Sequence, residues 1–440
     1  MAGRELVEGT LTSVLVEQTL VELAAGVVVQ PTGQRGRPLI LPAAVLWASL
    51  AIGVLRGVMS QADVWRLAMD RQLWRGPIVP VSDEAVYKRL ATADSNAMAT
   101  LFRQISALLT ERIAPWCDDT LVPWASDVVA LDATTLDPVA RSIPALRPVA
   151  RGDHALLPGK IAGLFDLRRQ QWRAITLIDD AHQNEKVSAR RLVGDLPPGS
   201  MIVADLGYFG FEWFDDLTDH GYLWVSRLRA KTTYRVQHVL YDDGVTVDSL
   251  VWLGAYRADR AKHLVRLIRV RTGATERAYL TNVTSPLFLQ PHDLVALYAR
   301  RWDIEMAVSL VKRQLGLHLL WSAKPSVIYH QIWAVLIIAQ IVHALRVEIA
   351  GRANIALFDV SIELLIRHFP RYAAQSDDPI SAYIADGPHL HYFRPSRRIT
   401  ITAAPYAMHH VIFPPPDLPT TQIPRYAHRK CGPRPPLTSN

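Results

Sequence analysis

The stretch from Pro291 to Gly316, PHDLVALYARRWDIEMAVSLVKRQLG, constrains the fold of this chain more than any other. Its apolar residues recur every three or four positions, which predicts one long helix with a buried face. Proline suits the first position of a helix, where no N–H is needed, and glycine suits the position after a helix end. The predicted buried face comprises Leu294, Leu297, Ile304, Val308, Val311 and Leu315.

Four polar residues border this apolar face. They are Tyr298, Arg301, Glu305 and Lys312. At 100° per residue they fall within an arc of roughly 60°. Other polar residues of the stretch, such as Arg300, Asp303 and Gln314, are predicted to face solvent. A carboxylate lodged between cations at the edge of a core needs a further partner, and a metal ion or a phosphate group fits that need.

The length and charge of the chain set broad limits on its class. With 440 residues it is long enough for two or three domains, and half of its residues are hydrophobic, as in ordinary soluble proteins. The formal charge is +7 and the pI about 9.4, which modestly favours a polyanionic partner. Cys117 and Cys431 lie far apart and lack partners at metal-binding spacing. We therefore expect a reducing cytoplasm, with neither a disulfide framework nor a zinc site.

No segment is predicted to cross a membrane. The best candidate, Leu39–Leu55, has about 17 residues, which is the lower limit for a span, and it contains Pro42. The apolar run Ile332–Leu345 is too short and includes Gln340 and His343. No charged segment followed by a short apolar run opens the chain, so we expect no signal peptide.

Residues 1 to about 115 are predicted to form an all-α domain. Ser60, Ser82 and Ser95 suit the position that caps a helix N-terminus. The predicted helices are Leu11–Ala25, Pro42–Val58, Ser60–Met69, Ser82–Leu90 and Ser95–Glu111. The third and fourth of them are typical of a helix-turn-helix arrangement, which would offer Tyr87–Arg89 to DNA. An all-α packing domain with a few exposed bases is an equally good interpretation.

From about residue 120 to 350, short apolar strands alternate with helices, which predicts an α/β domain. Two carboxylates directly follow predicted strands, Asp132 after Trp124–Leu131 and Asp205 after Met201–Ala204. The other predicted elements are a hairpin of two strands (Lys160–Leu167 and Trp172–Ile178), two helices (Asn184–Leu196 and Phe209–His220) and a further strand (Tyr222–Ser226). Strand ends are where α/β folds place their sites.

A stretch rich in β-branched residues and arginine, from about 227 to 283, is predicted to be a β-rich insertion. Between Arg227 and Arg271 it holds ten Lys and Arg against four Asp and Glu. This excess indicates either a solvated sheet face or a surface that contacts phosphates. Later helices are predicted at Val327–Arg346 and Ile355–His368. The region 351–440 holds the last helix and a Pro-rich basic tail, which we expect to be a loosely ordered arm that contacts DNA.

Asp132, Asp205 and Glu305 form a set of oxygen ligands. Three such carboxylates can hold two Mg²⁺ or Mn²⁺ ions about 3.5–4 Å apart, an arrangement used for phosphoryl transfer. Each acid alone is weak evidence, because an aspartate after a strand is more often a cap or a turn former. The acids that compete for this role are Asp137, Asp166, Asp179, Asp180 and Glu185.

The spacing Tyr298-x2-Arg301-x3-Glu305-x6-Lys312 resembles the Y-R-E-K signature of the DDE transposases of bacterial insertion sequences, the group named for insertion sequence number four. Residues 130–136 (ALDATTL) and 203–209 (VADLGYF) are similar to the family's segments around its two aspartates. Residues 301–305 (RWDIE) are similar to the run before its glutamate. The resemblance covers about residues 125–345.

The resemblance implies a ribonuclease-H-like catalytic core that is interrupted by the β-rich insertion and preceded by the helical DNA-binding domain. Asp132, Asp205 and Glu305 would be its catalytic residues and the ligands of two Mg²⁺ or Mn²⁺ ions. The remaining signature residues would bind DNA phosphates, since arginine holds a phosphate with two hydrogen bonds and lysine as a point charge.

The DNA contacts implied by the resemblance come from Tyr298, Arg301 and Lys312. Trp302 lies beside them and either stacks on the DNA or packs against the core. All four residues belong to the predicted long helix, so its geometry agrees with a shared role.

Two residues depart from the family pattern. Leu206 stands where an arginine often follows the second aspartate, and Ala133 where glycine is frequent after the first. Neither change removes a ligand. Because leucine cannot bind a phosphate, either one phosphate contact is lost at position 206 or Arg227 or Arg229 supplies it instead. Some family members stack a flipped base on a tryptophan of the insertion, for which Trp252 is the candidate here.

The sequence as a whole predicts a cut-and-paste DNA transposase in the bacterial cytoplasm, on the nucleoid when bound to DNA. Its partners would be double-stranded DNA, namely the inverted-repeat ends and the target, and the pairing of two ends predicts a homodimer. One alternative is a catalytically silent DNA-binding protein derived from a transposase. Another is a glycoside hydrolase with two acids, which would leave Tyr298, Arg301 and Lys312 unexplained.

Overall fold

The computed structural model describes residues 16–27, 40–58, 60–71, 73–74, 80–136, 160–178, 183–255, 259–317, 320–322, 324–396 and 405–426. Some residues of the sequence analysis fall outside this part of the chain, namely Asp137, Asp179, Asp180 and Cys431, together with residues 397–404 and 427–440 of the predicted tail.

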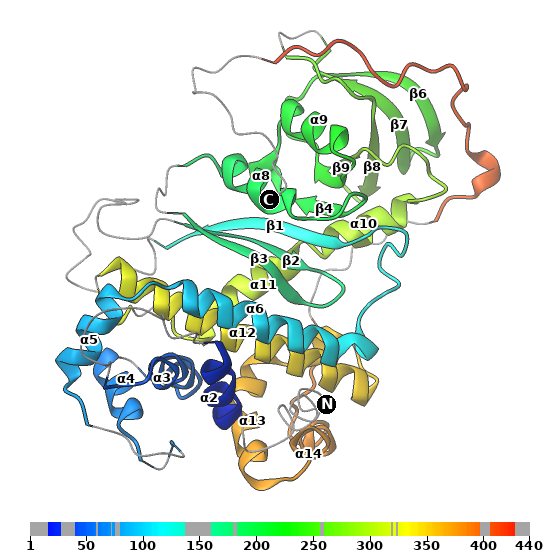
Figure 1. Cartoon of the computed structure of the whole chain (residues 1–440). Coiled ribbons are helices and arrows are strands. Elements are labelled where there is room, and N and C mark those ends of the chain that lie inside the picture. The colour runs from blue at the N-terminus through cyan, green and yellow to red at the C-terminus, as the bar shows by residue number, and fades with distance from the viewer. Residues whose placement is uncertain are drawn as a thin grey trace.

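One sheet forms the centre of the described part of the molecule (Figure 1). Its strand order is β3-β2-β1-β4-β5-β9-β8-β7-β6, and β4 runs parallel to both β1 and β5. The first five strands are β1 (Val128–Thr135), β2 (Lys160–Asp166), β3 (Gln171–Ile178), β4 (Met201–Ala204) and β5 (Leu223–Arg227). The predicted hairpin is confirmed, because β2 and β3 pair antiparallel. A mixed α/β fold around a large sheet is confirmed as well.

The β-rich insertion continues this sheet instead of forming a separate one. Its last strand, β9 (Thr275–Thr281), pairs antiparallel with β5 of the central part. The other strands are β6 (Tyr234–Asp242), β7 (Thr246–Leu253) and β8 (Val265–Thr272). Neighbouring strands of the insertion are antiparallel, with β6 at the outer edge. Backbone hydrogen bonds therefore link the insertion, through β5, to the strands β4 and β1 that lead to the two aspartates.

Helices cover both faces of the central strands. Along β1, Val128 and Ala130 face one core while Val129 and Leu131 face another, as the alternation of a strand requires. The first core includes the helices α6 (Asn96–Ile113), α10 (Pro291–Ala299), α11 (Trp302–Ser309) and α12 (Pro325–Ala353). The second core includes α8 (Glu185–Gly194) and α9 (Phe211–Asp219). Figure 1 shows α6 and α12 below the sheet and α8 and α9 above it. Burial on both faces explains why the first half of β1, Val128–Leu131, and all of β4 are continuous apolar runs.

The helix α12 (Pro325–Ala353) is much longer than the predicted Val327–Arg346. By length and composition it would suffice to cross a membrane, yet 94% of its most apolar stretch is buried inside this structure. Its polar residue Gln340 accepts a hydrogen bond from the N–H of Trp172 at 2.9 Å and donates to the carbonyl of Trp172 at 3.1 Å. The helix therefore serves as a core element that is bonded to the edge strand β3. The predicted membrane candidate Leu39–Leu55 contains the short buried helix α3.

The described residues before β1 are helical, close to the predicted boundaries. The helices are α2 (Val16–Val27), α3 (Ala43–Leu55), α4 (Gln61–Ala68), α5 (Asp83–Thr92) and α6 (Asn96–Ile113). Ser60 and Ser82 cap α4 and α5, since their hydroxyls accept from Asp63 N and Ala85 N. The predicted cap at Ser95 is wrong, because this residue has helical angles and makes no capping hydrogen bond.

The helix α5 does not offer all of Tyr87–Arg89 to a partner. The guanidinium of Arg89 donates to the carbonyl of Leu41, and burial lowers its pKa. Lys88 is exposed and pairs with Glu84 at 2.9 Å. The helices α3 to α6 share one apolar core with α12. The interpretation of this region as a packing domain therefore fits the position of Arg89 better than exposure to DNA does.

The predicted long helix is broken into three parts, α10 (Pro291–Ala299), α11 (Trp302–Ser309) and a π-helical segment, Leu310–Gln314. The cause is visible in the side chains at the break. Asp303, predicted to face solvent, is 2% exposed and bonds to Arg300 at 2.7 Å and to Gln170 at 2.8 Å. At the same place, hydrogen bonds from residue i to i–3 replace the regular ones at Arg300 and Arg301, as in a 3-10 turn.

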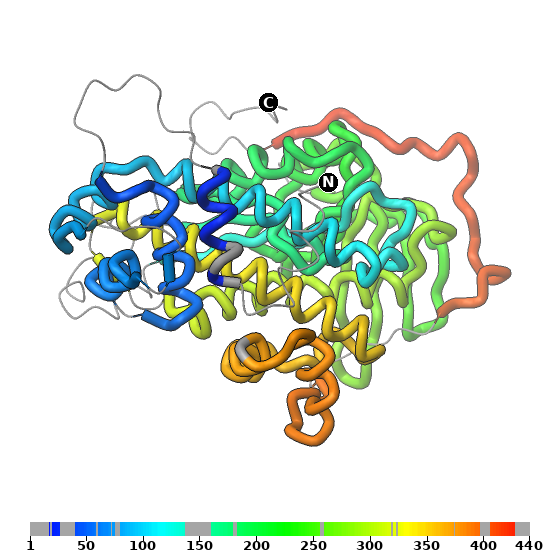
Figure 2. Tube along the Cα trace, turned by 60° about the horizontal axis from the view of Figure 1, so that its bottom comes forward, coloured from blue at the N-terminus to red at the C-terminus, as the bar shows by residue number. Residues whose placement is uncertain are grey.

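The C-terminal region consists of α13 (Ile362–Gln375), α14 (Pro379–Asp386) and an extended strap, defined as residues 405–426. Figures 1 and 2 show the strap along the outer side of the insertion. Backbone bridges join Arg260 to Arg425 and His263 to Thr421. The prediction of a loosely ordered arm is wrong for these residues, because backbone pairing and buried side chains tie them to the insertion.

Candidate active site

The register of two parallel strands brings Asp132 and Asp205 together. The strand β1 begins later than predicted and runs past Asp132 to Thr135, because the antiparallel β2 supports it there. The parallel partner β4 ends earlier, and the last pair of that ladder is Leu131 with Ala204. Asp132 and Asp205 each lie one residue beyond this pair, on strands about 4.8 Å apart. We call these two residues and Glu305 of α11 the acidic edge.

Asp132 is mostly buried at the edge of the core and has one backbone donor, Ala133 N, at 2.8 Å. Burial, above all, raises the pKa of this carboxyl to about 7, although the hydrogen bond from Ala133 and the charge of Arg301 oppose the rise. The negative charges of Asp205 and Glu305 add to it. The three acids are therefore close enough to repel one another, and a cation at this position would relieve that repulsion.

Asp205 begins the 3-10 turn Leu206–Tyr208 that follows β4. Its Oδ1 accepts a hydrogen bond from Gly207 N at 2.7 Å, which caps this turn. The cap fixes one carboxylate oxygen. The same residue thus fulfils the structural role that an aspartate after a strand commonly has.

Glu305 bonds to Arg301, with 2.6 Å between Oε1 and Nη1. The two residues are one helical turn apart across the start of α11, and the guanidinium of Arg301 also lies over the ring of Trp302, 5.4 Å from its centroid. Trp302 itself is 56% exposed, so the interpretation that it packs against the core is wrong. An exposed indole next to an arginine at a site edge is available for stacking.

Lys312 reaches the end of β1. Its ammonium group donates to the hydroxyl of Thr134 and to the carbonyl of Thr135, the latter at 2.8 Å. Burial lowers the pKa of Lys312, and the charge of Asp132 opposes the shift. The lysine thus lies on the same strand end as Asp132, although the π-helical segment alters the helix geometry assumed from the sequence.

Tyr298 is held against the insertion, where its ring meets that of Tyr279 at 5.3 Å. Burial raises the pKa of its phenol to about 12, while the nearby charges of Arg301 and Arg227 lower it. A phenol that stays protonated is a hydrogen-bond donor. Arg227 is exposed and near this residue, so the insertion contributes a cation to the same surface.

Two further predictions concern the insertion. Arg229 donates to the carbonyl of Leu206 at 2.8 Å, so its guanidinium lies beside the residue that departs from the family pattern. Trp252, in contrast, is buried in a small core with Leu240, Leu250 and Leu264, and it is not accessible to a base.

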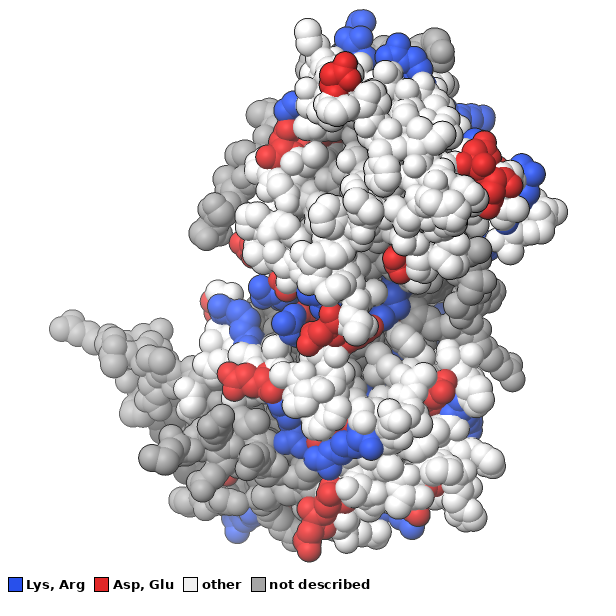
Figure 3. Space-filling view, turned by 90° about the vertical axis from the view of Figure 1, so that its right-hand side faces the viewer, with Lys and Arg blue, Asp and Glu red and all other residues white. Residues whose placement is uncertain are grey.

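The excess of Lys and Arg in the insertion does not gather on the face that Figure 3 shows. Arg266 is fully buried, and the face shown in Figure 3 is mostly uncharged over the insertion, with cations at its rim. Positive and negative groups alternate in the band across the middle of that view.

Asp166, one of the acids that compete for the role of metal ligand, has a structural role instead. It accepts from the N–H groups of Arg168 and Arg169 and thereby forms the β2–β3 turn.

Within the described residues, no three His, Cys, Asp or Glu side chains lie close enough together to hold a metal ion. At the acidic edge, Glu305 is paired with Arg301 in this structure. The donor set itself fits Mg²⁺ or Mn²⁺, because it consists of carboxylate oxygens and their negative charges are gathered.

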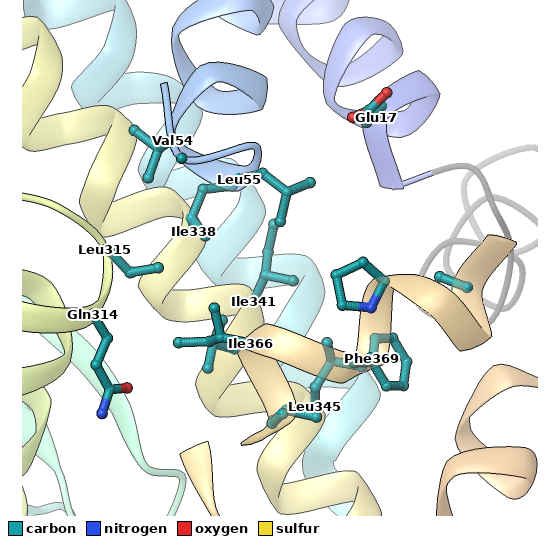
Figure 4. Close-up of a pocket in the computed structure, with 15 residues that line it drawn as sticks. Glu17, Val54, Leu55, Gln314, Leu315, Ile338, Ile341, Leu345, Ile366 and Phe369 are labelled. Atoms are coloured by element: carbon teal, nitrogen blue, oxygen red, sulfur yellow. The ribbon is translucent and has the colours of Figure 1, made fainter. Parts of the chain in front are cut away.

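The structure also contains an apolar cavity of about 340 Å³ on the far side of the π-helical segment (Figure 4). Leu315, Ile338 and Phe369 are among its lining residues, and Glu17 at its rim is paired with Arg56 at 2.7 Å. No titratable groups of the described chain converge there, so the acidic edge remains the candidate for chemistry.

Residues 123–341 match the family model described as "Transposase DDE domain". The chain carries a DDE transposase domain. This match starts just before β1, ends within α12 and includes every predicted site residue, although a match of this kind assigns no role to any of them.

Two further comparisons add little to the DDE assignment. No curated protein matches the sequence. Among solved structures, the chain is similar to one described as "Cryo-EM structure of piggyBac transposase synaptic complex with hairpin DNA (SNHP)", at 11% sequence identity and a TM-score of 0.38, over 90% of this chain and 86% of that chain. A likeness at this TM-score is too weak to assign a function.

Proposed function

We propose that this protein is a DNA transposase of the Y-R-E-K group, which binds the terminal inverted repeats of a bacterial insertion sequence and catalyses end cleavage and strand transfer. The observation that supports this is the gathering of Asp132, Asp205 and Glu305 at one edge of the sheet in a DDE domain. The mixed sheet with helices on both faces supports a ribonuclease-H-like core. In this proposal the chain divides into a DNA-binding region 1–115, a catalytic region 120–350 and a C-terminal region 351–440.

Asp132, Asp205 and Glu305 would hold Mg²⁺ or Mn²⁺, two ions per site. Bound ions of this kind activate the attacking water or 3′-OH and stabilise the leaving oxygen of a phosphodiester. Glu305 would have to leave Arg301 to join the two aspartates. The like charges already gathered around Asp132 favour such a change of partner once a cation is present.

The residues around the acidic edge would bind and orient the DNA. Arg301, when released by Glu305, has a planar guanidinium suited to a phosphate, and Lys312 at the end of β1 adds a second cation. Tyr298 would donate its phenol O–H, and the exposed Trp302 would stack on a base or sugar. Fixing the phosphate beside the carboxylates is the main requirement of phosphoryl transfer.

The remaining parts of the proposal concern partners and place. The N-terminal helices and the exposed arginines of the insertion, such as Arg227 and Arg229, would contact the repeat and the target duplex. Two ends must be paired, so a homodimer on DNA is expected. The protein would act in the bacterial cytoplasm, on the nucleoid.

An end-cleavage assay tests this function. The substrate is a duplex carrying the inverted repeat found beside the reading frame, with Mg²⁺ and the full-length protein. Wild type is expected to cleave at the repeat end, and Glu305→Gln to lose cleavage by about 10³-fold or more while binding the duplex as wild type does. A Glu305→Gln protein that cleaves normally would refute the assignment of this residue.

The second candidate is a catalytically silent DNA-binding protein derived from a transposase. The ion pair of Glu305 with Arg301 favours it, because the third carboxylate is neutralised by a cation of the protein itself. Absence of cleavage by wild type with both Mg²⁺ and Mn²⁺, together with specific binding of the repeat, would decide for this candidate.

A further inference from the structure

A fourth carboxylate reaches the acidic edge from the opposite face of the sheet. Glu185 is the first residue of α8, which packs on the second core, whereas Glu305 comes from the first-core side. The geometry at Gly207 shows how near Glu185 comes. A Cβ placed on Gly207 would lie 2.9 Å from Oδ1 of Asp205 and 3.0 Å from Oε2 of Glu185.

A carboxylate oxygen of Asp205 and one of Glu185 thus both lie about 3 Å from the position that a side chain at Gly207 would take. The N–H of Gly207 already donates to Asp205, which fixes the backbone at this point. Two carboxylates that face one position favour a cation there.

The hydroxyl of Tyr208 lies near the same carboxylates. Tyr208 is 1% exposed, and its hydroxyl has no hydrogen-bond partner within the described structure. The charges of Asp132, Glu185 and Asp205 all act on this hydroxyl. A buried donor without an acceptor costs about 1–3 kcal/mol, so a hydroxyl left in this state beside three acids calls for a functional explanation.

The simplest structural role for Glu185 is already filled by its neighbour. The side chain of Asn184 caps α8 by accepting from Lys186 N at 3.1 Å. An acid in the first helical turn adds only about 0.3–1 kcal/mol through the helix dipole. That contribution does not require Glu185 to turn towards Asp205.

Lys160 is the counter-charge of Glu185 in this structure. Its ammonium group lies 3.7 Å from Oε1 of Glu185 and donates to the carbonyl of Gln183 at 3.3 Å. Lys160 belongs to β2 and is almost fully buried, so it cannot move far. This cation balances one oxygen of Glu185, while the other oxygen faces Asp205 across Gly207.

We propose that Glu185 is a further carboxylate of the metal site, which holds a divalent cation together with Asp205 while the Tyr208 hydroxyl donates to one of these carboxylates. The cation is of the hard, oxygen-binding class, Mg²⁺ or Mn²⁺. This inference rests on the proposed function, because it adds a residue to the same site. Its role is to hold and orient the cation on the Asp205 side.

Direct measurement of Mn²⁺ binding tests the role without relying on cleavage. The full-length protein is titrated with Mn²⁺ alone, without DNA, by calorimetry and by the loss of the electron paramagnetic resonance signal of unbound Mn²⁺. Glu185→Gln is expected to weaken Mn²⁺ binding by about 10–100-fold, the range seen when supporting groups of metal sites are removed. Asp205→Asn serves as the reference for losing a principal ligand.

A matched control is available in α5. Glu84 also lies in the first turn of a helix and pairs with a lysine, Lys88 at 2.9 Å, but it is exposed and belongs to the N-terminal helices. Glu84→Gln should bind Mn²⁺ as wild type does. If Glu185→Gln also binds as wild type while Asp205→Asn loses binding, the inference is refuted and the proposed function stands. If wild type binds no Mn²⁺, or Asp205→Asn binds it normally, the proposed function itself fails.

A second variant keeps the test decisive if Glu185→Gln does not fold. Lys160→Met removes the counter-charge and leaves both oxygens of Glu185 to the cation. We expect Mn²⁺ binding to tighten several-fold, the opposite sign to that of a disrupted site. Unchanged or weaker binding by a folded Lys160→Met protein would contradict the inference.

Discussion

Two clusters of buried charge in this protein differ in how completely their charges are balanced. The first, which we call the insertion cluster, consists of Arg266, Asp248 and Tyr406. Arg266 and Asp248 are both 0% exposed and share hydrogen bonds of 2.6 and 2.9 Å, and Arg266 donates further to the carbonyl of Leu289 at 2.6 Å. The second is the acidic edge, where three carboxylates meet and the cations present are bonded elsewhere or to one acid only.

This difference in charge balance distinguishes the insertion cluster, which has a structural role, from the acidic edge, which is the candidate site. In the insertion cluster each charge has an opposite charge and a set of hydrogen bonds, so the energy of burial is offset within the protein. At the acidic edge the repulsion among Asp132, Asp205 and Glu305 remains, and the protein tolerates it only because the rest of the fold is stable. Unbalanced negative charge at the end of two parallel strands is what a cation-binding site requires in its metal-free state.

The largest effect is expected from breaking the insertion cluster. Arg266→Met leaves the carboxylate of Asp248 buried without its cation, so the free energy of unfolding should fall by about 3–5 kcal/mol. Urea unfolding followed by circular dichroism measures this. The double variant Arg266→Met/Asp248→Leu should recover most of the loss, because no unpaired charge remains. A loss below about 1 kcal/mol in the single variant would show that the cluster is not balanced as described.

At the acidic edge, removing a charge is expected to raise the free energy of unfolding instead of lowering it. Asp132→Asn removes a carboxylate whose charged form burial and its neighbours disfavour. Thermal unfolding at pH 8 with a chelator should show a gain of about 2 kcal/mol, reduced from the full electrostatic value because the residue is partly exposed. The same variant should lose DNA cleavage. A destabilised Asp132→Asn protein would contradict the view that this charge is unbalanced.

His343 tests whether every unpartnered buried polar group signals a site. Both of its ring nitrogens lack hydrogen-bond partners in the described structure, and burial lowers its pKa to about 3. Below pH 6.5 the unfolded chain therefore takes up a proton that the native state refuses, so stability should fall with pH by up to about 1.4 kcal/mol per unit.

Replacing this histidine isolates its share of the acid sensitivity. His343→Leu should unfold with a weaker pH dependence than wild type between pH 6.5 and 4.5, as measured by urea unfolding at several pH values. The ring contacts Phe165 at 5.2 Å in an apolar core, so DNA binding and cleavage should be unaffected. Identical pH dependence in the two proteins would show that His343 is not buried in its neutral form.

The smallest effect is expected from loosening the strap. The hydroxyl of Tyr406 donates to Asp248 at 2.7 Å and accepts from Arg266 at 3.0 Å. Tyr406→Phe removes these bonds while leaving the ion pair, and about 1–2 kcal/mol of stability should be lost. Limited proteolysis should cut the strap faster than in wild type. Unchanged cleavage of the strap would mean that its backbone bridges alone hold it.

The sequence predicted the elements of the α/β region well where the periodicity was clear. The strand Met201–Ala204 is correct at both ends, and the β2–β3 hairpin and the helix after Asn184 lie close to their predicted positions. Errors came from contacts between distant parts of the chain. The break in the predicted long helix depends on Gln170, and the burial of Arg89 depends on the carbonyl of Leu41.

The candidate site was predictable in its residue types but not in its geometry. The Y-R-E-K spacing identified Tyr298, Arg301, Glu305 and Lys312, and all of them lie near the end of β1 or its neighbours. They do not lie on one uninterrupted α-helix, since α10 ends before Trp302 and α11 is followed by a π-helical segment. The role inferred for Glu185 had no signal beyond its being one of several nearby acids.

The sequence by itself determined which groups are available for chemistry, because the apolar periodicity fixes the strands and the spacing of polar residues fixes which side chains accompany them. Only the tertiary structure decided which of these groups meet. The Leu131–Ala204 register sets Asp132 beside Asp205, and the absence of a side chain at Gly207 lets Glu185 approach from the other face of the sheet. These contacts depend on strand pairing and helix packing between segments far apart in the sequence, which local sequence patterns do not encode.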